Sequence, residues 1–158
     1  MHLSGSVTSG LGRASVFMSQ SHYQDQFRKI LGATAWPGTL NVHVENNDLS
    51  SYIALRQKAG IDTLDLDEEL IDKVSKIDTS NIEAMRIRGF LREGRSFGGA
   101  TAYLAEISTS ESKNISCAIL IPDLTRHVEV IEVIADVFLR ESLNLNDGSV
   151  VNLDLIVD

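Results

Sequence analysis

The sequence predicts a mainly β fold, a small barrel with helical excursions, in a single domain that spans residues 1–158. Two observations carry this prediction. Six or more short segments rich in β-branched and apolar residues are separated by turn residues, without the regular strand–helix alternation of a parallel α/β sheet. A length of 158 residues also suits one domain, and no linker, repeat or low-complexity segment divides it.

The first 45 residues are expected to contain three strands and one helix. A short strand is predicted around Val7 and another ending at Phe17, with a glycine loop between them. Apolar residues at helical spacing then predict a helix from an N-cap at Ser21 to a C-terminal Gly32. After the turn at 36–38, alternating apolar residues over 39–45 predict a half-buried strand.

Residues 46–84 form a polar, acidic segment that is expected to be a helical insertion. One helix is predicted over 50–60 and another over 65–77. The second carries four acidic residues on its outer face, and a solvated helix surface is favoured over a cation site for them: Asp67, Glu68, Glu69 and Asp72.

The remainder of the chain is expected to be rich in strands. A hairpin is predicted around the turn at 92–95, and 115–122 reads as a buried strand. The β-branched content of 127–135 favours another strand. Asp136 is then expected to cap a short helix, and 146–148 to form a turn before a final strand whose apolar face runs from Val151 to Val157.

Composition narrows the range of partners. The net charge of −8 argues against general affinity for nucleic acid or anionic membrane, although it allows a phosphate ligand to be held locally. The single cysteine, Cys117, excludes an internal disulfide and a cysteine-based zinc cluster, and its apolar setting predicts an inert core thiol. The N-terminus has no signal-peptide pattern and no run is long enough to cross a membrane, so we expect a cytoplasmic protein.

The glycine loop is the first candidate for chemistry. Gly10 and Gly12 allow backbone N–H groups to converge on an anion, and Arg13 adds a positive charge. The loop matches neither common nucleotide-binding fingerprint. Taken alone, it is read as a hairpin turn in preference to a phosphate cradle.

Thr39 and Asn41 are the second candidate, because residues two apart on a strand project from the same face. Two neutral oxygens suit Mg²⁺ that is held mainly by phosphate oxygens. The alternative is that both side chains satisfy backbone groups beside the turn.

Two charged residues in the segment 125–140 are the third candidate. Glu132 lies between apolar neighbours and can serve a ligand or act as a general base, or else belong to the wet face of an edge strand. Arg140 suits a phosphate or a surface ion pair equally. Separately, His43-x-Glu45 and His127-x-Glu129 leave open a metal site that joins two strands.

These signals occur in a fixed order that resembles the archaeal CTP-dependent riboflavin kinases. The resemblance covers about residues 5–155 apart from 46–84 and rests on "SGLGRASVFMS", "PGTLNV", "AILIPDLTRHVEVIEVIA" and "LRESLNLNDGSVV". It implies a six-stranded cradle-loop barrel that transfers the γ-phosphoryl of CTP to the 5′-hydroxyl of riboflavin. FMN and CDP would be the products. Separately, we expect the protein to be a monomer.

The resemblance also implies roles for particular residues. It places Mg²⁺ on Thr39 and Asn41, and flavin contacts on Thr125 and Glu132, where Glu132 is our candidate catalytic residue. It assigns nucleotide binding to two segments: Gly10, Leu11, Gly12, Arg13, Ala14 and Ser15, and Val137, Phe138, Leu139 and Arg140.

The chain departs from the family pattern beside the second nucleotide segment. Asp136 and Phe138 stand where the family usually has a proline and a lysine, which leaves the base preference open. The alternative reading of the whole sequence is a non-catalytic barrel that binds a flavin or a nucleotide as a sensor or interaction module. Retention of both Thr39 and Asn41 favours the kinase.

Overall fold

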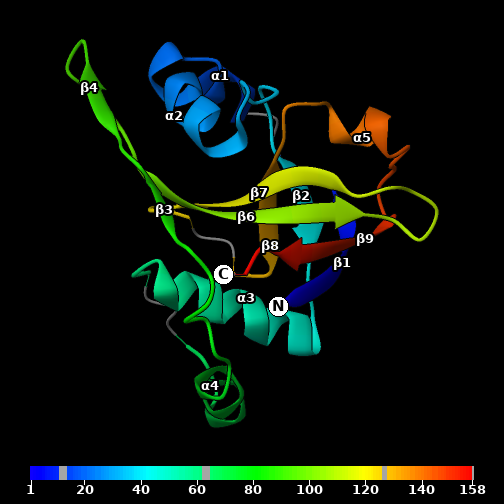
Figure 1. Cartoon of the computed structure of the whole chain (residues 1–158). Coiled ribbons are helices and arrows are strands. Elements are labelled where there is room, and N and C mark those ends of the chain that lie inside the picture. The colour runs from blue at the N-terminus through cyan, green and yellow to red at the C-terminus, as the bar shows by residue number, and fades with distance from the viewer. Residues whose placement is uncertain (11–13, 62–64, 126–127, 158) are drawn as a thin grey trace.

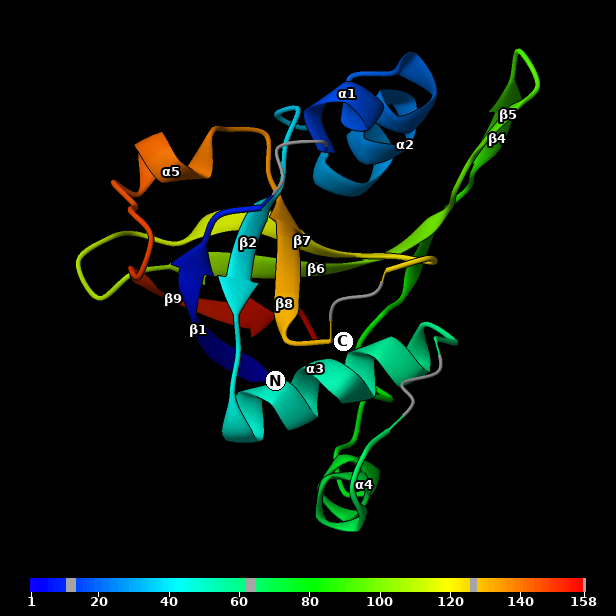
Figure 2. The same cartoon turned by 180° about the vertical axis from the view of Figure 1, so that it is seen from behind.

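Six antiparallel strands close into a barrel in the computed structural model, which describes residues 1–10, 14–61, 65–125 and 128–157 (Figures 1 and 2). Along the barrel, neighbours run in the order β6, β7, β8, β2, β1 and β9, and β9 pairs back with β6. Their bounds are Ala100–Ser108, Ile115–Pro122, Val130–Ile134, Leu40–His43, His2–Thr8 and Val150–Leu155, in that order. The predicted six-stranded barrel is confirmed.

The barrel interior is filled by alternate residues of each strand, as the period of two requires. Val42, Ile131 and Leu153 are among the residues packed there, and each is at most 1% exposed. Tyr103 adds a polar anchor, because its buried hydroxyl donates a 2.7 Å hydrogen bond to the carbonyl of Leu55, which lies in the helix Asn46–Lys58. Cys117 lies in the same core, where burial raises the pKa of its thiol to about 12.

Two helices, α1 (Ala14–Met18) and α2 (Ser21–Leu31), cover one end of the barrel (Figure 1). The predicted second strand ending at Phe17 is therefore wrong. The segment is helical because this arrangement packs Ala14 and Met18 with Phe27 of α2. Gly32 ends α2 with a φ of 78°, as predicted, whereas the N-cap is Gln20 and makes no side-chain cap bond.

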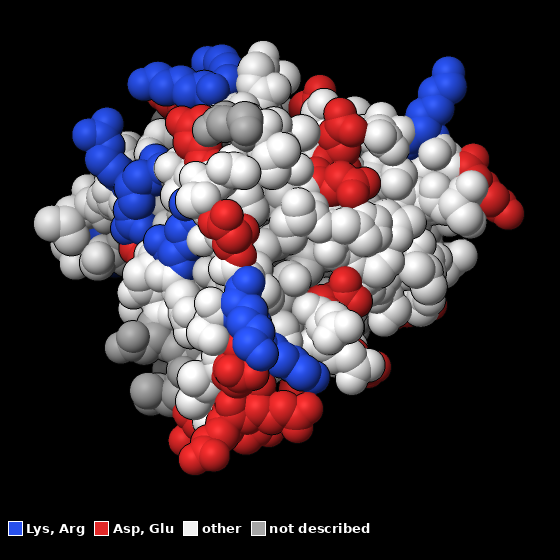
Figure 3. Space-filling view, turned by 60° about the horizontal axis from the view of Figure 1, so that its bottom comes forward, with Lys and Arg blue, Asp and Glu red and all other residues white. Residues whose placement is uncertain are grey.

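The polar segment folds as α3 (Asn46–Lys58) and α4 (Glu68–Ser75), at the opposite end of the barrel from α1 and α2 (Figures 1 and 2). Both predicted helices are confirmed. α3 packs against the barrel through Tyr52 and Leu55, which are almost fully buried. α4 exposes acidic side chains with lysines one turn away, and Figure 3 shows both signs of charge close together on this part of the surface.

A long hairpin extends from the barrel as an arm (Figure 1). Its base is β3 (Met85–Ile87), which pairs with β6, and its outer part is formed by β4 (Phe90–Arg92) and β5 (Arg95–Phe97). β4 pairs with β5 around the turn at Glu93 and Gly94, both of which have positive φ. The predicted hairpin at 92–95 is confirmed.

The C-terminal part corrects two predictions. The short helix α5 (Leu139–Ser142) begins after Phe138, so Asp136 does not cap it. The last strand ends at Leu155, and Val157 is 53% exposed because the pairing with β6 and β1 has run out. No helix within the described ranges has the length and apolar character needed to cross a membrane.

Candidate active site

Two adjoining pockets open beside α1, the second with the larger share of polar lining, and they share Ala14, Thr39 and Glu132. The first, the apolar pocket, has a volume of about 310 Å³. It is lined by Ala14, Phe17, Met18, Tyr23, Phe27, Thr39, Ile87, Ser96, Phe97, Gly98, Gly99, Ala100, Leu120, Pro122, Leu124 and Glu132.

The second, the polar pocket, has a volume of about 820 Å³. It is lined by Thr8, Ser9, Gly10, Ala14, Trp36, Pro37, Gly38, Thr39, Leu40, Asn41, Val130, Glu132, Val133, Ala135, Val137, Phe138, Leu139 and Arg140. Both volumes lie within or close to the range usual for small-molecule sites, about 300–1,000 Å³.

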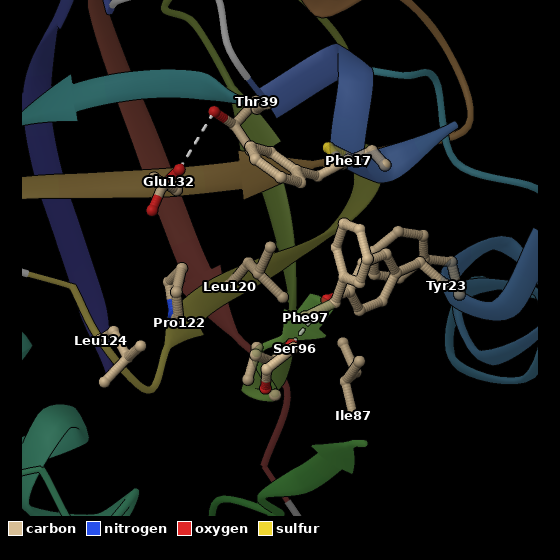
Figure 4. A pocket seen from close by; sticks show the side chains of 16 residues that line it. Phe17, Tyr23, Thr39, Ile87, Ser96, Phe97, Leu120, Pro122, Leu124 and Glu132 are labelled. Carbon is tan, nitrogen blue, oxygen red and sulfur yellow. Dashed lines mark hydrogen bonds between the residues drawn. The ribbon is translucent and has the colours of Figure 1, made fainter. Parts of the chain in front are cut away.

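Aromatic side chains from separate elements form much of the apolar pocket (Figure 4). The Phe97 ring on the arm meets the Phe17 ring of α1 edge-on, with centroids 6.1 Å apart. Tyr23 is held in place because its hydroxyl donates a 2.6 Å hydrogen bond to the Gly98 carbonyl. The arm and the two helices thus create flat apolar walls that suit a planar ring system.

Thr39 and Glu132 line both pockets and so mark their boundary, and Figure 4 shows the hydrogen bond that joins the two side chains. The Thr39 hydroxyl lies 3.3 Å from Glu132 Oε1, to which it donates, and 3.4 Å from Asn41 Oδ1. The register of the sheet causes this convergence, because Asn41 of β2 is directly opposite Glu132 of β8. Three oxygen-bearing side chains therefore meet where the pockets join.

The start of the glycine loop is packed directly on this group. A Cβ at Gly10 would lie 2.0 Å from Nδ2 of Asn41, so only glycine fits while the Asn41 amide keeps its present position. The backbone of Gly10 thus limits the rotation of the Asn41 side chain.

Arg140 lies on the wall of the polar pocket and is oriented by a carboxylate. Its Nη2 donates to Asp147 Oδ1 at 2.7 Å and to the Thr8 carbonyl at 3.4 Å. Asp147 also accepts a 2.7 Å hydrogen bond from the Ser9 hydroxyl. The bonds from Ser9 and Arg140 lower the pKa of Asp147, so its carboxylate is ionised at neutral pH.

The structure brings most of the predicted site residues together. Gly10, Ala14 and the segment 137–140 line the polar pocket beside Thr39 and Asn41. Ser15 lies in α1, while Leu11, Gly12 and Arg13 fall outside the described residues. Thr125 lies in the turn after β7, one residue beyond Leu124 of the apolar pocket, and is not among the residues that line it.

Sequence reasoning missed the aromatic walls and the anchor of Arg140. The sequence predicts a strand that ends at Phe17, and nothing local in the sequence links Phe97 to it. The sequence predicts Asp147 only as part of a turn. The signal that could have indicated the ion pair is the opposite charge of Arg140, seven residues earlier in the chain.

The alternative His/Glu metal site gains little support. His43 Nε2 lies 3.4 Å from Glu129 Oε2, and Nδ1 lies 3.8 Å from Glu45 Oε1, while His127 falls outside the described residues. Within the described ranges, no group of three or more His, Cys, Asp or Glu residues is placed to hold a metal ion.

Comparison with known families gives the context of this geometry. Residues 7–70 and 59–155 match a family model described as Domain of unknown function DUF120, whose short name denotes CTP-dependent riboflavin kinases. The chain belongs to this family.

Curated relatives agree with the match. Over 97% of the chain, it is 31% identical to a riboflavin kinase of Thermoplasma acidophilum. It is 33% identical over 98% of its length to one of Haloquadratum walsbyi, and 36% identical over 93% to one of Methanocorpusculum labreanum. The chain spans 56%, 56% and 54% of the length of these relatives.

Proposed function

We propose that this chain is a riboflavin kinase that transfers the γ-phosphoryl group of CTP to the 5′-hydroxyl of riboflavin, giving FMN and CDP, with Mg²⁺ as cofactor. The observation that carries the proposal is the shared boundary of the two pockets, at which Thr39 and Glu132 belong to both. Two substrates bound on either side would meet at these residues, which is what phosphoryl transfer requires of a protein.

The two pockets match the two substrates in chemical character. The aromatic walls of the apolar pocket suit the flat isoalloxazine ring, with the ribityl chain extending towards Thr39 and Glu132. The polar pocket offers Arg140 and the backbone around Gly10 to a triphosphate. The family and its relatives support flavin phosphorylation, and the family's short name supports CTP as the donor.

The residues at the boundary fit a magnesium ion. Adjacent oxygen ligands at about 2.0–2.1 Å in an octahedral site lie about 3 Å apart. The Thr39 hydroxyl lies 3.4 Å from Asn41 Oδ1, close to that separation. Thr39 and Asn41 would hold the ion, with phosphate oxygens completing much of its shell. When bound, Mg²⁺ neutralises phosphate charge.

In this proposal Glu132 accepts the proton of the riboflavin hydroxyl. The hydroxyl oxygen forms a bond to the γ-phosphorus while the bond from that phosphorus to the β–γ bridging oxygen breaks, and CDP leaves. The hydroxyl proton passes to the Glu132 carboxylate, which Thr39 orients through its 3.3 Å hydrogen bond. Arg140 stabilises negative charge on the phosphates.

The activity is tested by incubating the protein with riboflavin, Mg²⁺ and each of CTP, ATP, GTP and UTP, and measuring FMN. We expect product with CTP and none after chelation of Mg²⁺. Binding of flavin or nucleotide without product from any donor would contradict the kinase and leave a non-catalytic binding barrel.

The role of Glu132 is tested by Glu132→Gln, which keeps the size of the side chain. General acid–base catalysis contributes about 10²–10⁴-fold, so we expect kcat to fall by that order while riboflavin binding is retained. Wild-type turnover in Glu132→Gln would remove the proposed role.

We also propose that residues 1–158 act as one cytoplasmic monomeric domain, with 46–84 as an insertion. A sedimentation experiment at the concentration of the assay tests the monomer, since a dimer there would contradict it.

A further inference from the structure

Two large aromatic side chains are stacked at the rim of the polar pocket instead of being buried. The rings of Trp36 and Phe138 lie with centroids 5.2 Å apart and planes 19° apart. Their side chains stay 47% and 40% exposed, and both line the polar pocket. Exposed aromatic surface beside a pocket is a typical feature of a binding site.

The backbone that carries the two rings is anchored by hydrogen bonds at both residues. The Trp36 N–H donates a 2.7 Å hydrogen bond to the carbonyl of Ala135, which follows β8 and is buried. The Phe138 carbonyl accepts from the Ser142 N–H at 2.9 Å. Since both segments are anchored, a ligand ring that stacks here meets an ordered surface and loses less entropy on binding.

The rings lie within reach of the phosphate end of the same pocket. Trp36 is three residues before Thr39, and Phe138 is two residues before Arg140. Three residues span at most about 11 Å, which is comparable to the reach of a nucleoside triphosphate. With its phosphates at Thr39 and Arg140, a nucleotide can therefore place its base at the rim.

We propose that the Trp36–Phe138 pair is the platform on which the nucleobase of the phosphoryl donor stacks. This inference rests on the proposed function, because it assumes that the polar pocket binds a nucleoside triphosphate. Every base has a π-face, and stacking on aromatic side chains tolerates any base. The nearby lining residues Pro37, Val137 and Leu139 have apolar side chains, so the platform strengthens binding of purine and pyrimidine nucleotides alike.

Trp36 is the only tryptophan of the chain, so its fluorescence reports on this platform alone. The full chain is titrated with the Mg²⁺ complexes of CTP, of ATP and of inorganic tripolyphosphate, which lacks a base. We expect saturable quenching by both nucleotides. Tripolyphosphate should displace the nucleotides without quenching the fluorescence itself.

Substitutions at Phe138 separate stacking from mere bulk. Phe138→Tyr keeps an aromatic face, whereas Phe138→Leu keeps an apolar side chain without one. Loss of one stacking contact corresponds to about tenfold in affinity. We expect Phe138→Leu and Phe138→Ala to weaken binding of CTP and ATP by about that factor, Phe138→Tyr to match the wild type, and all four proteins to bind tripolyphosphate equally.

The outcomes distinguish this proposal from the proposed function. The platform is overturned if tripolyphosphate quenches Trp36 as strongly as CTP does, or if Phe138→Leu binds nucleotides like the wild type. In the latter case the two rings only shelter each other from water. If the platform results hold but no donor yields FMN, the kinase assignment fails and nucleotide stacking stands. The wild-type titration needs no variant, so misfolding of a variant does not prevent the test.

Discussion

Asn41 connects the glycine loop to the boundary between the two pockets. Its amide oxygen lies 3.4 Å from the Thr39 hydroxyl, and its amide nitrogen faces the backbone of Gly10. The backbone of one loop thus limits the orientation of a candidate metal ligand on a strand. Substitutions at either residue should affect the same property.

We predict that Gly10→Ala and Asn41→Ala each raise the Mg²⁺ concentration needed for half-maximal activity by at least about tenfold, the lower end of the effect of disturbing a metal site. An added Cβ at Gly10 would lie 2.0 Å from Asn41 Nδ2 and push the amide away. The double variant should be no worse than Asn41→Ala, since both changes disturb the same candidate ligand.

Gly98→Ala is the matched control for this pair, because a Cβ there meets no atom within 4 Å. Since Gly98 lines the apolar pocket, the comparison is made at saturating riboflavin. The Mg²⁺ dependence of Gly98→Ala should equal that of the wild type. Additive losses in the double variant would show that Gly10 acts on something other than Asn41.

At the scale of elements, the arm contributes to the apolar pocket from one end only. Phe97, at the base of β5, lines the pocket, whereas Leu91 in β4 is 77% exposed and is not among the lining residues. The two stacked rings of Phe90 and Phe97, with centroids 4.6 Å apart, stiffen the ribbon where it meets the pocket. The arm therefore acts as a wall and not only as a connection.

We predict that Phe97→Ala raises the KM for riboflavin by roughly tenfold or more, because burying such a side chain is worth about 1.5–3 kcal/mol. The KM for the nucleotide should stay unchanged. Steady-state kinetics with each substrate varied in turn measures both values, and Leu91→Ala is the control. An equal effect of Phe97→Ala on both substrates would indicate general disruption instead.

A second link between elements runs through Asp147, which joins the end of β1 to α5. The bonds from Ser9 and Arg140 lower its pKa from 3.8, so the link is complete at neutral pH. A carboxylate whose pKa is lowered by folding stabilises the fold fully at any pH above its pKa in the unfolded chain. This contribution is lost as the pH falls through the lower pKa of the folded state. We expect the link to persist down to about pH 4.

We predict that Asp147→Asn raises the KM for the nucleotide several-fold, because Arg140 loses its charged partner while the side chain keeps its size. Riboflavin KM should not change. The two KM values at pH 7 provide the check, and Asp154→Asn, on β9 and paired with His2 outside both pockets, is the control. Unchanged nucleotide KM in Asp147→Asn would show that Arg140 needs no anchor.

At the scale of the whole molecule, closure of the barrel encloses Cys117 completely. The thiol is 1% exposed and its pKa is raised to about 12, chiefly by burial. Only the thiolate reacts with disulfide reagents, and the neutral form predominates until the pH approaches the raised value. Access to this sulfur therefore requires the barrel to open.

We predict that Cys117 is not labelled by an aromatic disulfide reagent at pH 8 in the native protein and reacts fully in denaturant. The labelling rate at intermediate denaturant should follow the fraction unfolded measured by circular dichroism. Rapid labelling of the native protein would show that the barrel opens locally at β7.

Much of this architecture could be predicted from the sequence, because the alternation of apolar and polar residues along a strand is a local signal. The inward residues of β2 and β9, the two helices of 46–84 and the hairpin at 92–95 all followed from periodicity and turn residues. The helix α1 was missed because its five residues are too few for a periodic signal, and packing on α2 decides their conformation.

For the site, the sequence indicated which residues matter but not how they meet. The spacing of Thr39 and Asn41 predicted a common face, and their oxygens do lie together. The approach of Glu132 depends on the register between β2 and β8, which no local pattern reveals. The aromatic walls depend on contacts between residues as distant as Phe17 and Phe97.

The common boundary at Thr39 and Glu132 has a practical consequence for inhibitor design. A flavin tethered to a nucleoside through a short polyphosphate bridge would fill the apolar pocket and the polar pocket with one molecule. Its second half would bind at a high effective concentration, so affinity should exceed that of either half by about 10²–10⁴-fold when the tether length matches the span. A series of tethers, compared by calorimetry, would thereby measure the separation of the two substrates; no gain at any length would mean that the two pockets cannot be occupied together.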